Sequence, residues 1–195
     1  AWRPLYWPRT ATPGRSVTPR MDLRALAEQI KAWGRELGFQ RVGIAAAELP
    51  ADERHLLEWL AAGRHGEMEY MQRHGTKRAR PAELVPGTVR VISARMDYWP
   101  GGADPEEVLA DPALGYVSRY AVGRDYHKVI RTRLARLAER IAAAAGTAGY
   151  RAFTDSAPVL EKALARDASL GWIGKHTNLL DRHDGSWFFL GEIFT

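Results

Sequence analysis

The chain has 195 residues, of which 46% are hydrophobic, carries a formal net charge of +5 and contains no cysteine. This length and apolar content predict one domain with a buried core. The absence of cysteine excludes disulfides, thiolate nucleophiles and cysteine-bound zinc or iron–sulfur centres within this stretch. The positive charge arises mostly from residues 1–20, which contain four arginines and no acid, so it is weak evidence for nucleic-acid binding.

Residues 1–20 are rich in Pro, Arg and Thr and show no hydrophobic periodicity, which predicts a disordered extension. They lack the apolar stretch of a signal peptide, and Met21 is a plausible start. A transmembrane helix is not expected, because no apolar run approaches the ~18 residues that such a helix needs. We therefore expect the folded domain to occupy 21–195.

The folded part begins with a predicted helix after Asp22, because apolar residues recur there at spacings of three and four and Gly38 ends the pattern. Hydrophobic runs and turn residues then predict short elements that alternate between strand and helix. In chain order these are a strand at 41–47, a helix at 51–62, a short helix after Gly66, a strand at 89–99 and a loop at 100–112.

The strongest predicted helix spans about 125–145, where five large apolar residues line one side. The segment YRAFT then predicts a strand that runs into Asp155, and Pro158 suits the first turn of a helix that stops near Gly171. The final segments NLLD and SWFFLGEIF, separated by a turn at 183–185, predict a hairpin. This order of elements favours an α/β or α+β fold, with a mixed β-sheet covered by helices.

Asp155 lies at the predicted strand-to-helix corner and is the candidate catalytic residue. In one interpretation, Asp155 or Ser156 caps the helix and Pro158 presets its first turn. In the other, Asp155 is an acid at the rim of a pocket, kept protonated near neutral pH by burial. Ligands often bind at strand ends in such folds. Both interpretations hold if Ser156 is the cap.

Three further motifs contain glycine or polar residues that suit ligand contacts. GWIGKHT at 171–177 is not a phosphate-binding loop, since Ser169 and His176 stand where that motif needs other residues. Its glycines suit a helix stop and close approach to a flat ligand. GRDYHK at 123–128 is typical of a charged helix start, and KRARPAELVPG at 77–87 of a basic loop that is solvated or contacts an anion. The six histidines show no tight ligand spacing, so no metal site is predicted.

Four stretches, in this order, resemble the epoxyqueuosine reductase family: KRARPAELVPG, YVSRYAVGRDYHKVIRTRLARLAERI, FTDSAPVLEKALARDASLGWIGKHTNLL and GSWFFLGEIFT. The resemblance covers about 21–195. It implies an α/β cobalamin-binding domain, related to nitroreductase-like B12-processing proteins. It also implies the activity of the family, which reduces epoxyqueuosine to queuosine at the wobble position of a tRNA with cobalamin and two 4Fe–4S clusters.

The resemblance further implies that the chain is the N-terminal part of such an enzyme. The family's ferredoxin-like domain, which carries the cluster cysteines, would begin where this chain stops at Thr195. Truncation then explains the missing cysteines. We therefore expect this chain by itself to lack unaided activity.

By motif, Asp155 matches the family's proton donor, and five residues match positions that contact cobalamin: Arg78, Ser118, Asp155, Leu179 and Leu190. Leu179 and Leu190 would support the corrin from the terminal hairpin. Arg78 would reach a polar corrin side chain, and Ser118 would leave room for the ring. An acid suits this chemistry because an epoxide opens more readily when its oxygen is protonated as the C–O bond breaks.

The resemblance implies a tRNA with epoxyqueuosine in its anticodon loop as substrate and an electron donor of unknown identity. It also implies a cytoplasmic monomer without membrane contact. Three alternatives stay open at this point. They are a non-catalytic module that binds or hands on cobalamin, a flavin nitroreductase-like enzyme, and a structural fragment that binds neither cofactor.

Overall fold

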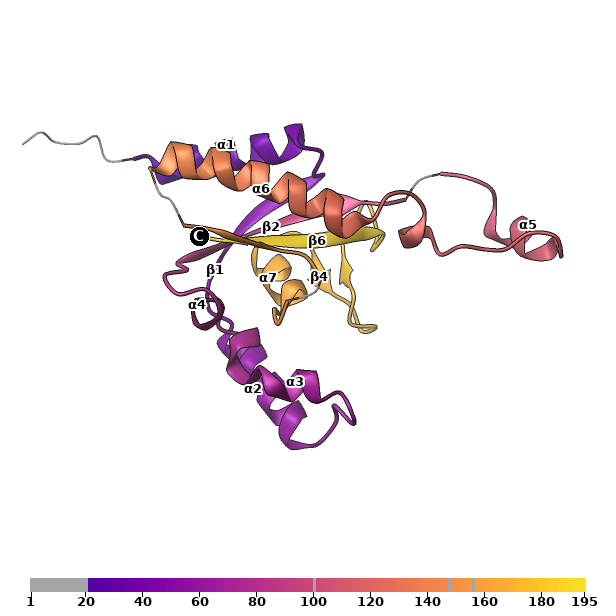
Figure 1. Ribbon diagram of the computed structural model, residues 1–195, viewed down its shortest axis with the longest axis horizontal. Coiled ribbons are helices and arrows are strands. Elements are labelled where there is room, and N and C mark those ends of the chain that lie inside the picture. The colour runs from indigo at the N-terminus through magenta and orange to yellow at the C-terminus, as the bar shows by residue number, and fades with distance from the viewer. Residues whose placement is uncertain (1–20, 100, 147–148, 156) are drawn as a thin grey trace, which may run out of the picture.

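The structure is a computed structural model that describes residues 21–99, 101–146, 149–155 and 157–195. Its centre is a four-stranded antiparallel sheet with helices on both faces (Figure 1). The strands follow one another across the sheet in the order β1 (Arg41–Ala46), β2 (Arg90–Asp97), β6 (Phe188–Phe194) and β3 (Arg151–Phe153). The predicted extension at 1–20 lies outside the described residues.

Helices α1 (Leu23–Glu36) and α6 (Tyr126–Ala145) cover one face of the sheet (Figure 1). As predicted, α1 starts where the Asp22 carboxylate accepts hydrogen bonds from backbone N–H groups of the first turn. Helix α6 ends at Gly146, whose φ of 66° is the left-handed conformation that glycine adopts freely. Buried apolar side chains join both helices to the sheet, among them Ile30, Ile130, Leu134 and Ile193.

The opposite face is covered by α7 (Glu161–Asp167), next to a small sheet of β4 (Trp172–Ile173) and β5 (Leu179–Leu180) (Figure 1). The segment between β1 and β2 forms an arm that leads away from the sheet, and the long connection before α6 extends to one side. These two segments contain α2 (Pro50–Ala61), α3 (Glu69–Arg73), η1 (Gly75–Arg78), α4 (Pro81–Leu84), α5 (Pro105–Ala110) and η2 (Arg119–Ala121).

The predicted fold class is confirmed, because helices cover an extended sheet in an α/β (α+β) arrangement. The strand pairs within the described residues are antiparallel, so the sheet is antiparallel rather than mixed. The long arm between β1 and β2 returns the chain to the neighbouring position in the opposite direction. Strand β6 then inserts between β2 and β3, and its residues are the last in the chain to join the sheet.

Two local predictions were wrong. The segment 100–112 contains α5, which begins at Pro105 and is capped by the Asp104 carboxylate. The terminal hairpin is also built differently, since β5 pairs with β4 whereas β6 pairs with β2 and β3. The predicted turn is confirmed, because Asp181 and Gly185 form an antiparallel bridge around it. No helix in the described ranges is both long and apolar enough to cross a membrane.

A Gly43→Ala substitution is expected to lower the free energy of unfolding by about 1–3 kcal/mol, because overpacking forces the backbone apart. A Cβ atom at Gly43 on β1 would lie 2.0 Å from the carbonyl oxygen of Ala168, where α7 ends. Urea unfolding measures the effect. Gly115→Ala is the control, since its Cβ would meet nothing within 4 Å. Equal midpoints for the two variants would contradict this packing of α7 on β1.

Candidate functional site

Asp155 follows β3 in a loop rather than capping a helix. Helix α7 begins only at Glu161, after an N-cap at Leu160 that makes no side-chain capping bond. The cap interpretation of Asp155 is therefore wrong, and Pro158 precedes the helix instead of lying in its first turn. Ser156, the other candidate cap, lies outside the described residues. Asp155 has a φ of 59°, a left-handed conformation that is uncommon for a residue with a side chain.

The Asp155 carboxylate contacts two side chains from the first turn of α6. Tyr126 Oη donates a hydrogen bond to Asp155 Oδ2 at 2.5 Å, and His127 Nε2 lies 3.2 Å from the same oxygen. The Tyr126 ring stacks on Phe189 of β6, with centroids 3.9 Å apart and planes within 4°. The first turn of α6 therefore contacts the Asp155 carboxylate directly, and β6 supports this contact through the Tyr126 ring.

His127 is held from both sides. Its Nδ1 lies 2.9 Å from Asp125 Oδ1, and the same oxygen accepts the backbone N–H of His127 at 3.0 Å. Asp125 is therefore the N-cap of α6, which begins where GRDYHK predicted a helix start, and it also orients the imidazole. With Nδ1 facing Asp125, the other ring nitrogen faces Asp155.

The sequence did not indicate that Tyr126 and His127 meet Asp155, since they are 29 and 28 residues away. The motif was interpreted only as a charged helix start. One signal in the sequence could have marked Tyr126 and His127 as site residues: both follow directly after a helix cap. Side chains in the first turn of a helix point toward the loops that precede it. That signal locates the partners only when the packing of α6 beside β3 is known.

The protonation of Tyr126 follows from its surroundings. Burial, and then the hydrogen bond to Asp155, raise the pKa of the Tyr126 hydroxyl well above its usual value. Tyr126 is therefore a phenol that donates to Asp155 at neutral pH. Asp155 itself is not desolvated by this chain, because its side chain is 60% exposed, contrary to the burial expected from the sequence. It lies at the surface of the described residues, with one oxygen engaged.

The other residues that the sequence predicted to contact cobalamin are Leu179, Leu190, Ser118 and Arg78. Leu179 is buried in an apolar cluster against which Leu190 packs, so these two lie together. The β3–β6 pairing ends at Phe153↔Glu192, so Asp155 lies two residues beyond the last paired residue of β3, and Leu190 lies two residues before Glu192 on β6. Ser118 is exposed at the start of η2. Among the described contacts, none joins Ser118 to Asp155.

Arg78 is buried at the end of η1, and its guanidinium is already engaged. It donates to the backbone carbonyls of Tyr70 and Met71, at 2.9 and 3.4 Å. The Arg78 carbonyl accepts the backbone N–H of Leu160 at 3.0 Å. Arg78 therefore ties the arm to the residue that precedes α7, immediately after the Asp155 loop.

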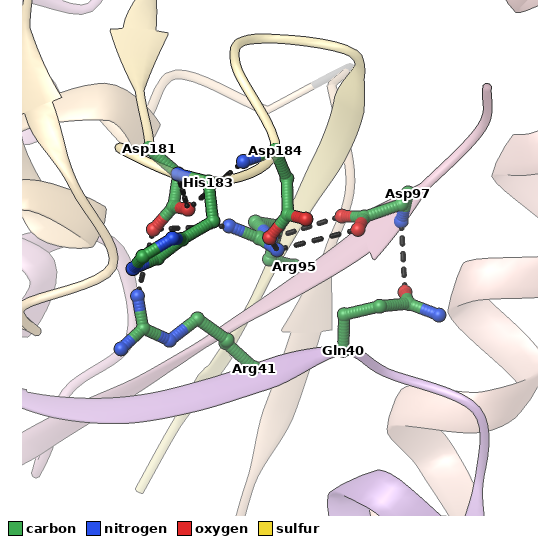
Figure 2. A network of polar contacts seen from close by, with 7 residues as sticks. All are labelled: Gln40, Arg41, Arg95, Asp97, Asp181, His183 and Asp184. Carbon is green, nitrogen blue, oxygen red and sulfur yellow. Dashed lines mark hydrogen bonds and ion pairs between the residues drawn. The ribbon is translucent and has the colours of Figure 1, made fainter.

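The segment that carries Leu179 and Leu190 is held by an ion-pair network, shown in Figure 2. Arg95 on β2 is 1% exposed and lies 2.9 Å from Asp97 and 2.5 Å from Asp184. It also lies 3.4 Å from Asp181, which Arg41 on β1 binds at 2.7 Å. The Asp181 carboxylate further accepts the backbone N–H groups that close the turn. The network thereby attaches the turn between β5 and β6 to the central sheet.

Two hollows are lined by residues that contact Asp155, Tyr126 in one and Glu161 in the other. One, of about 650 Å³, is lined by aromatic rings that include Tyr126 and Phe189. The other, of about 420 Å³, lies between α2 and α7 and includes Glu161. No cluster of three or more metal-binding side chains occurs in the part of the chain that the structure describes.

The glycines of GWIGKHT serve the protein's own packing. A Cβ at Gly171 would lie 2.1 Å from the Leu180 carbonyl oxygen, and one at Gly174 would lie 2.7 Å from the His176 ring. The close approach expected from these glycines is therefore made by β5 and its turn. They allow β4 and β5 to pair beside Leu179.

Comparisons with known proteins agree on one family. The protein-family model described as "Epoxyqueuosine reductase QueG, DUF1730" matches residues 78–156 of this chain. An epoxyqueuosine reductase of Pseudomonas aeruginosa is 65% identical over 173 residues, which are 89% of this chain and 48% of that protein. The chain thus spans about half the length of the curated relatives it matches.

Three solved structures show the same fold. A selenomethionine-labelled epoxyqueuosine reductase has a TM-score of 0.76 at 20% identity, covering 89% of this chain and 46% of its own. The Bacillus subtilis enzyme has a TM-score of 0.69 at 20% identity, and the match covers 89% of this chain and 45% of that one. It is described with its aspartate-bearing catalytic loop swung out of the active site. An epoxyqueuosine reductase solved with an epoxyqueuosine-modified tRNA-Tyr stem loop has a TM-score of 0.66 at 18% sequence identity. The match covers 88% of this chain and 45% of that one.

Proposed function

Because this chain belongs to the epoxyqueuosine reductase family, we propose that it is the cobalamin-binding part of an enzyme that reduces epoxyqueuosine to queuosine in tRNA. Residues 21–195 form that part, and Asp155 is its proton donor. The observation that carries the proposal is the Asp155 carboxylate at a strand end, in contact with Tyr126 and His127. The relative solved with an epoxyqueuosine-modified tRNA stem loop supports tRNA as the substrate.

Removal of the epoxide oxygen as water consumes two electrons and two protons. Asp155 gives a proton to the oxygen as the C–O bond breaks, which is worth roughly 10²–10⁴-fold in rate. Its Oδ2 accepts the Tyr126 hydroxyl, and we assign the proton transfer to Oδ1, for which no partner occurs among the described contacts. As the carboxylate forms, the Tyr126 O–H stabilises its charge. The His127 ring contacts the same carboxylate and can return a proton to it between the two transfers.

The residues present fit cobalamin as a large ring with apolar faces. Leu190 is half-buried and packs, like Phe188, against the apolar cluster that contains Leu179. In this proposal Leu179, Leu190 and Asp155 would contact the ring, with Arg78 and Ser118 at its edge. When bound, cobalamin supplies the low-valent cobalt that carries the reduction. The remainder of the enzyme would hold two 4Fe–4S clusters, which would supply electrons from a donor. We place this enzyme in the cytoplasm, as a monomer.

The experiment uses the full-length protein that contains this sequence, loaded with cobalamin and reconstituted with iron and sulfide. It is incubated with tRNA carrying epoxyqueuosine and a chemical reductant, and nucleosides are analysed by mass spectrometry. We expect conversion to queuosine, with loss of one oxygen. Binding of cobalamin without conversion would indicate a cofactor-handling module instead. A yellow protein that releases flavin would indicate a nitroreductase-like enzyme.

A further inference from the structure

The Asp155 loop is held by a second carboxyl group. The backbone N–H of Asp155 donates a hydrogen bond to Glu161 Oε1 at 2.7 Å, and Glu161 is the first residue of α7. The left-handed conformation of Asp155 costs free energy for a residue with a Cβ atom. Such a conformation persists when surrounding contacts impose it. The bond to Glu161 is a contact of this kind, made at the strained residue itself.

A third carboxyl group lies beneath the same helix. Glu192 on β6 is fully buried, and its register partners are Ser93 on β2 and Phe153 on β3. Paired residues share a face of the sheet, and Phe153 packs in one buried cluster with Leu164 of α7, so this is the face that α7 covers. Within the described ranges, neither carboxyl oxygen of Glu192 has a hydrogen-bond partner. Burial, and then the charge of Glu161, raise the pKa of Glu192 well above its usual value, which favours its neutral form.

Glu161 changes its charge near neutral pH. Burial raises its pKa to about 7, against the lowering effect of the Asp155 N–H bond. The ionisable groups around it come from four elements: Asp155 in the loop, Glu192 on β6, Lys162 on α7, and Asp52 and His55 of α2 across the hollow. An ionised carboxylate is a stronger acceptor than a neutral carboxyl group. The bond to the Asp155 N–H therefore strengthens as Glu161 loses its proton.

We propose that Glu161 is a positioning residue that keeps the Asp155 loop where its carboxylate meets Tyr126 and His127, and that Glu192 is the neutral acid beneath it. This inference rests on the proposed function, in which Asp155 is the proton donor. The relative whose catalytic loop is swung out shows that such a loop has a second position. In this chain, Glu161 is the group that selects the inward position.

The first test follows the loop itself and needs no turnover. Hydrogen exchange of the full-length protein is measured for a peptide spanning 150–160, in which the Asp155 amide is retained, as a protection factor at pH 6 and pH 8. We expect Glu161→Ala to lower protection of the Asp155 amide about tenfold or more, since a bond to a charged acceptor is lost. Wild-type protection should increase from pH 6 to pH 8, whereas Glu161→Gln, which accepts but cannot ionise, should show no such increase. Unchanged protection in Glu161→Ala would overturn the proposal.

The second test measures turnover of epoxyqueuosine tRNA. Glu161→Ala should lower kcat about tenfold or more with little change in KM, and Glu161→Gln should restore most of it. Glu139→Ala, at an exposed position of α6, is the control that should leave kcat unchanged. Glu192→Gln mimics the neutral acid and should retain both protection and kcat. A large loss in Glu192→Gln would show that Glu192 is ionised. If wild type lacks turnover but Glu161→Ala loses protection, the proposed function fails and the positioning role of Glu161 stands.

Discussion

An Asp155→Asn variant of the full-length enzyme is expected to reduce epoxyqueuosine about 10²–10⁴-fold more slowly than wild type, because it removes the acid that protonates the epoxide oxygen. Asparagine has nearly the same shape, and its amide oxygen can still accept the Tyr126 hydroxyl. The substitution therefore leaves the loop and the stacked rings in place while it removes the transferable proton. Single-turnover kinetics with excess enzyme measure the effect on the chemical step.

The control variant is Asp167→Asn, at the end of α7. Its carboxylate forms an exposed ion pair with Arg166, which contributes little to stability. Cobalamin content, read from the absorption spectrum, should be equal in wild type and both variants. An Asp155→Asn enzyme with wild-type rate and equal cobalamin content would remove Asp155 from the mechanism.

Replacing Arg95 by methionine is expected to lower the free energy of unfolding by about 3 kcal/mol. Breaking one partner of a buried ion pair typically costs about 3–5 kcal/mol, because a charge is left without its counterion. The lower end applies here, since Asp181 keeps Arg41 and the Asp184 side chain is 48% exposed. Urea unfolding of the protein measures the loss. Arg140→Met, which removes an exposed pair with Glu36, is the control and should cost about 0–1 kcal/mol.

The same variant should lose stability at low pH earlier than wild type. Burial alone would raise the pKa of Asp181, but two backbone N–H groups and the guanidinium groups of Arg95 and Arg41 lower it to about 2. The resulting stability is present above the unfolded-state pKa of about 4 and is lost as pH falls through 2. Without Arg95 the folded pKa rises toward the unfolded value, so this contribution shrinks. An identical acid-unfolding midpoint in Arg95→Met would contradict a role for Arg95 in holding Asp181 ionised.

Local patterns in the sequence determined most of the elements. The apolar spacing after Asp22 and the run before Gly146 define α1 and α6, because one face of each helix must be buried. The motifs also identified the family, which the comparisons confirm. The pattern missed α5, which buries none of its residues, so no apolar periodicity marked it.

The partners of Asp155 were decided only by the tertiary structure. Tyr126 and His127 reach the carboxylate because α6 packs beside the end of β3, and Glu161 reaches its N–H because α7 begins six residues later. The turn that follows β5 is likewise held by a residue far away in the chain, the buried Arg95, which pairs with Asp181 and Asp184. Contacts between residues far apart in the chain depend on how whole elements pack. A hydrophobic pattern indicates which face of an element is buried, but it does not indicate which other element covers that face. The sequence thus determined that Asp155 stands at a strand end, while the fold decided which groups surround it.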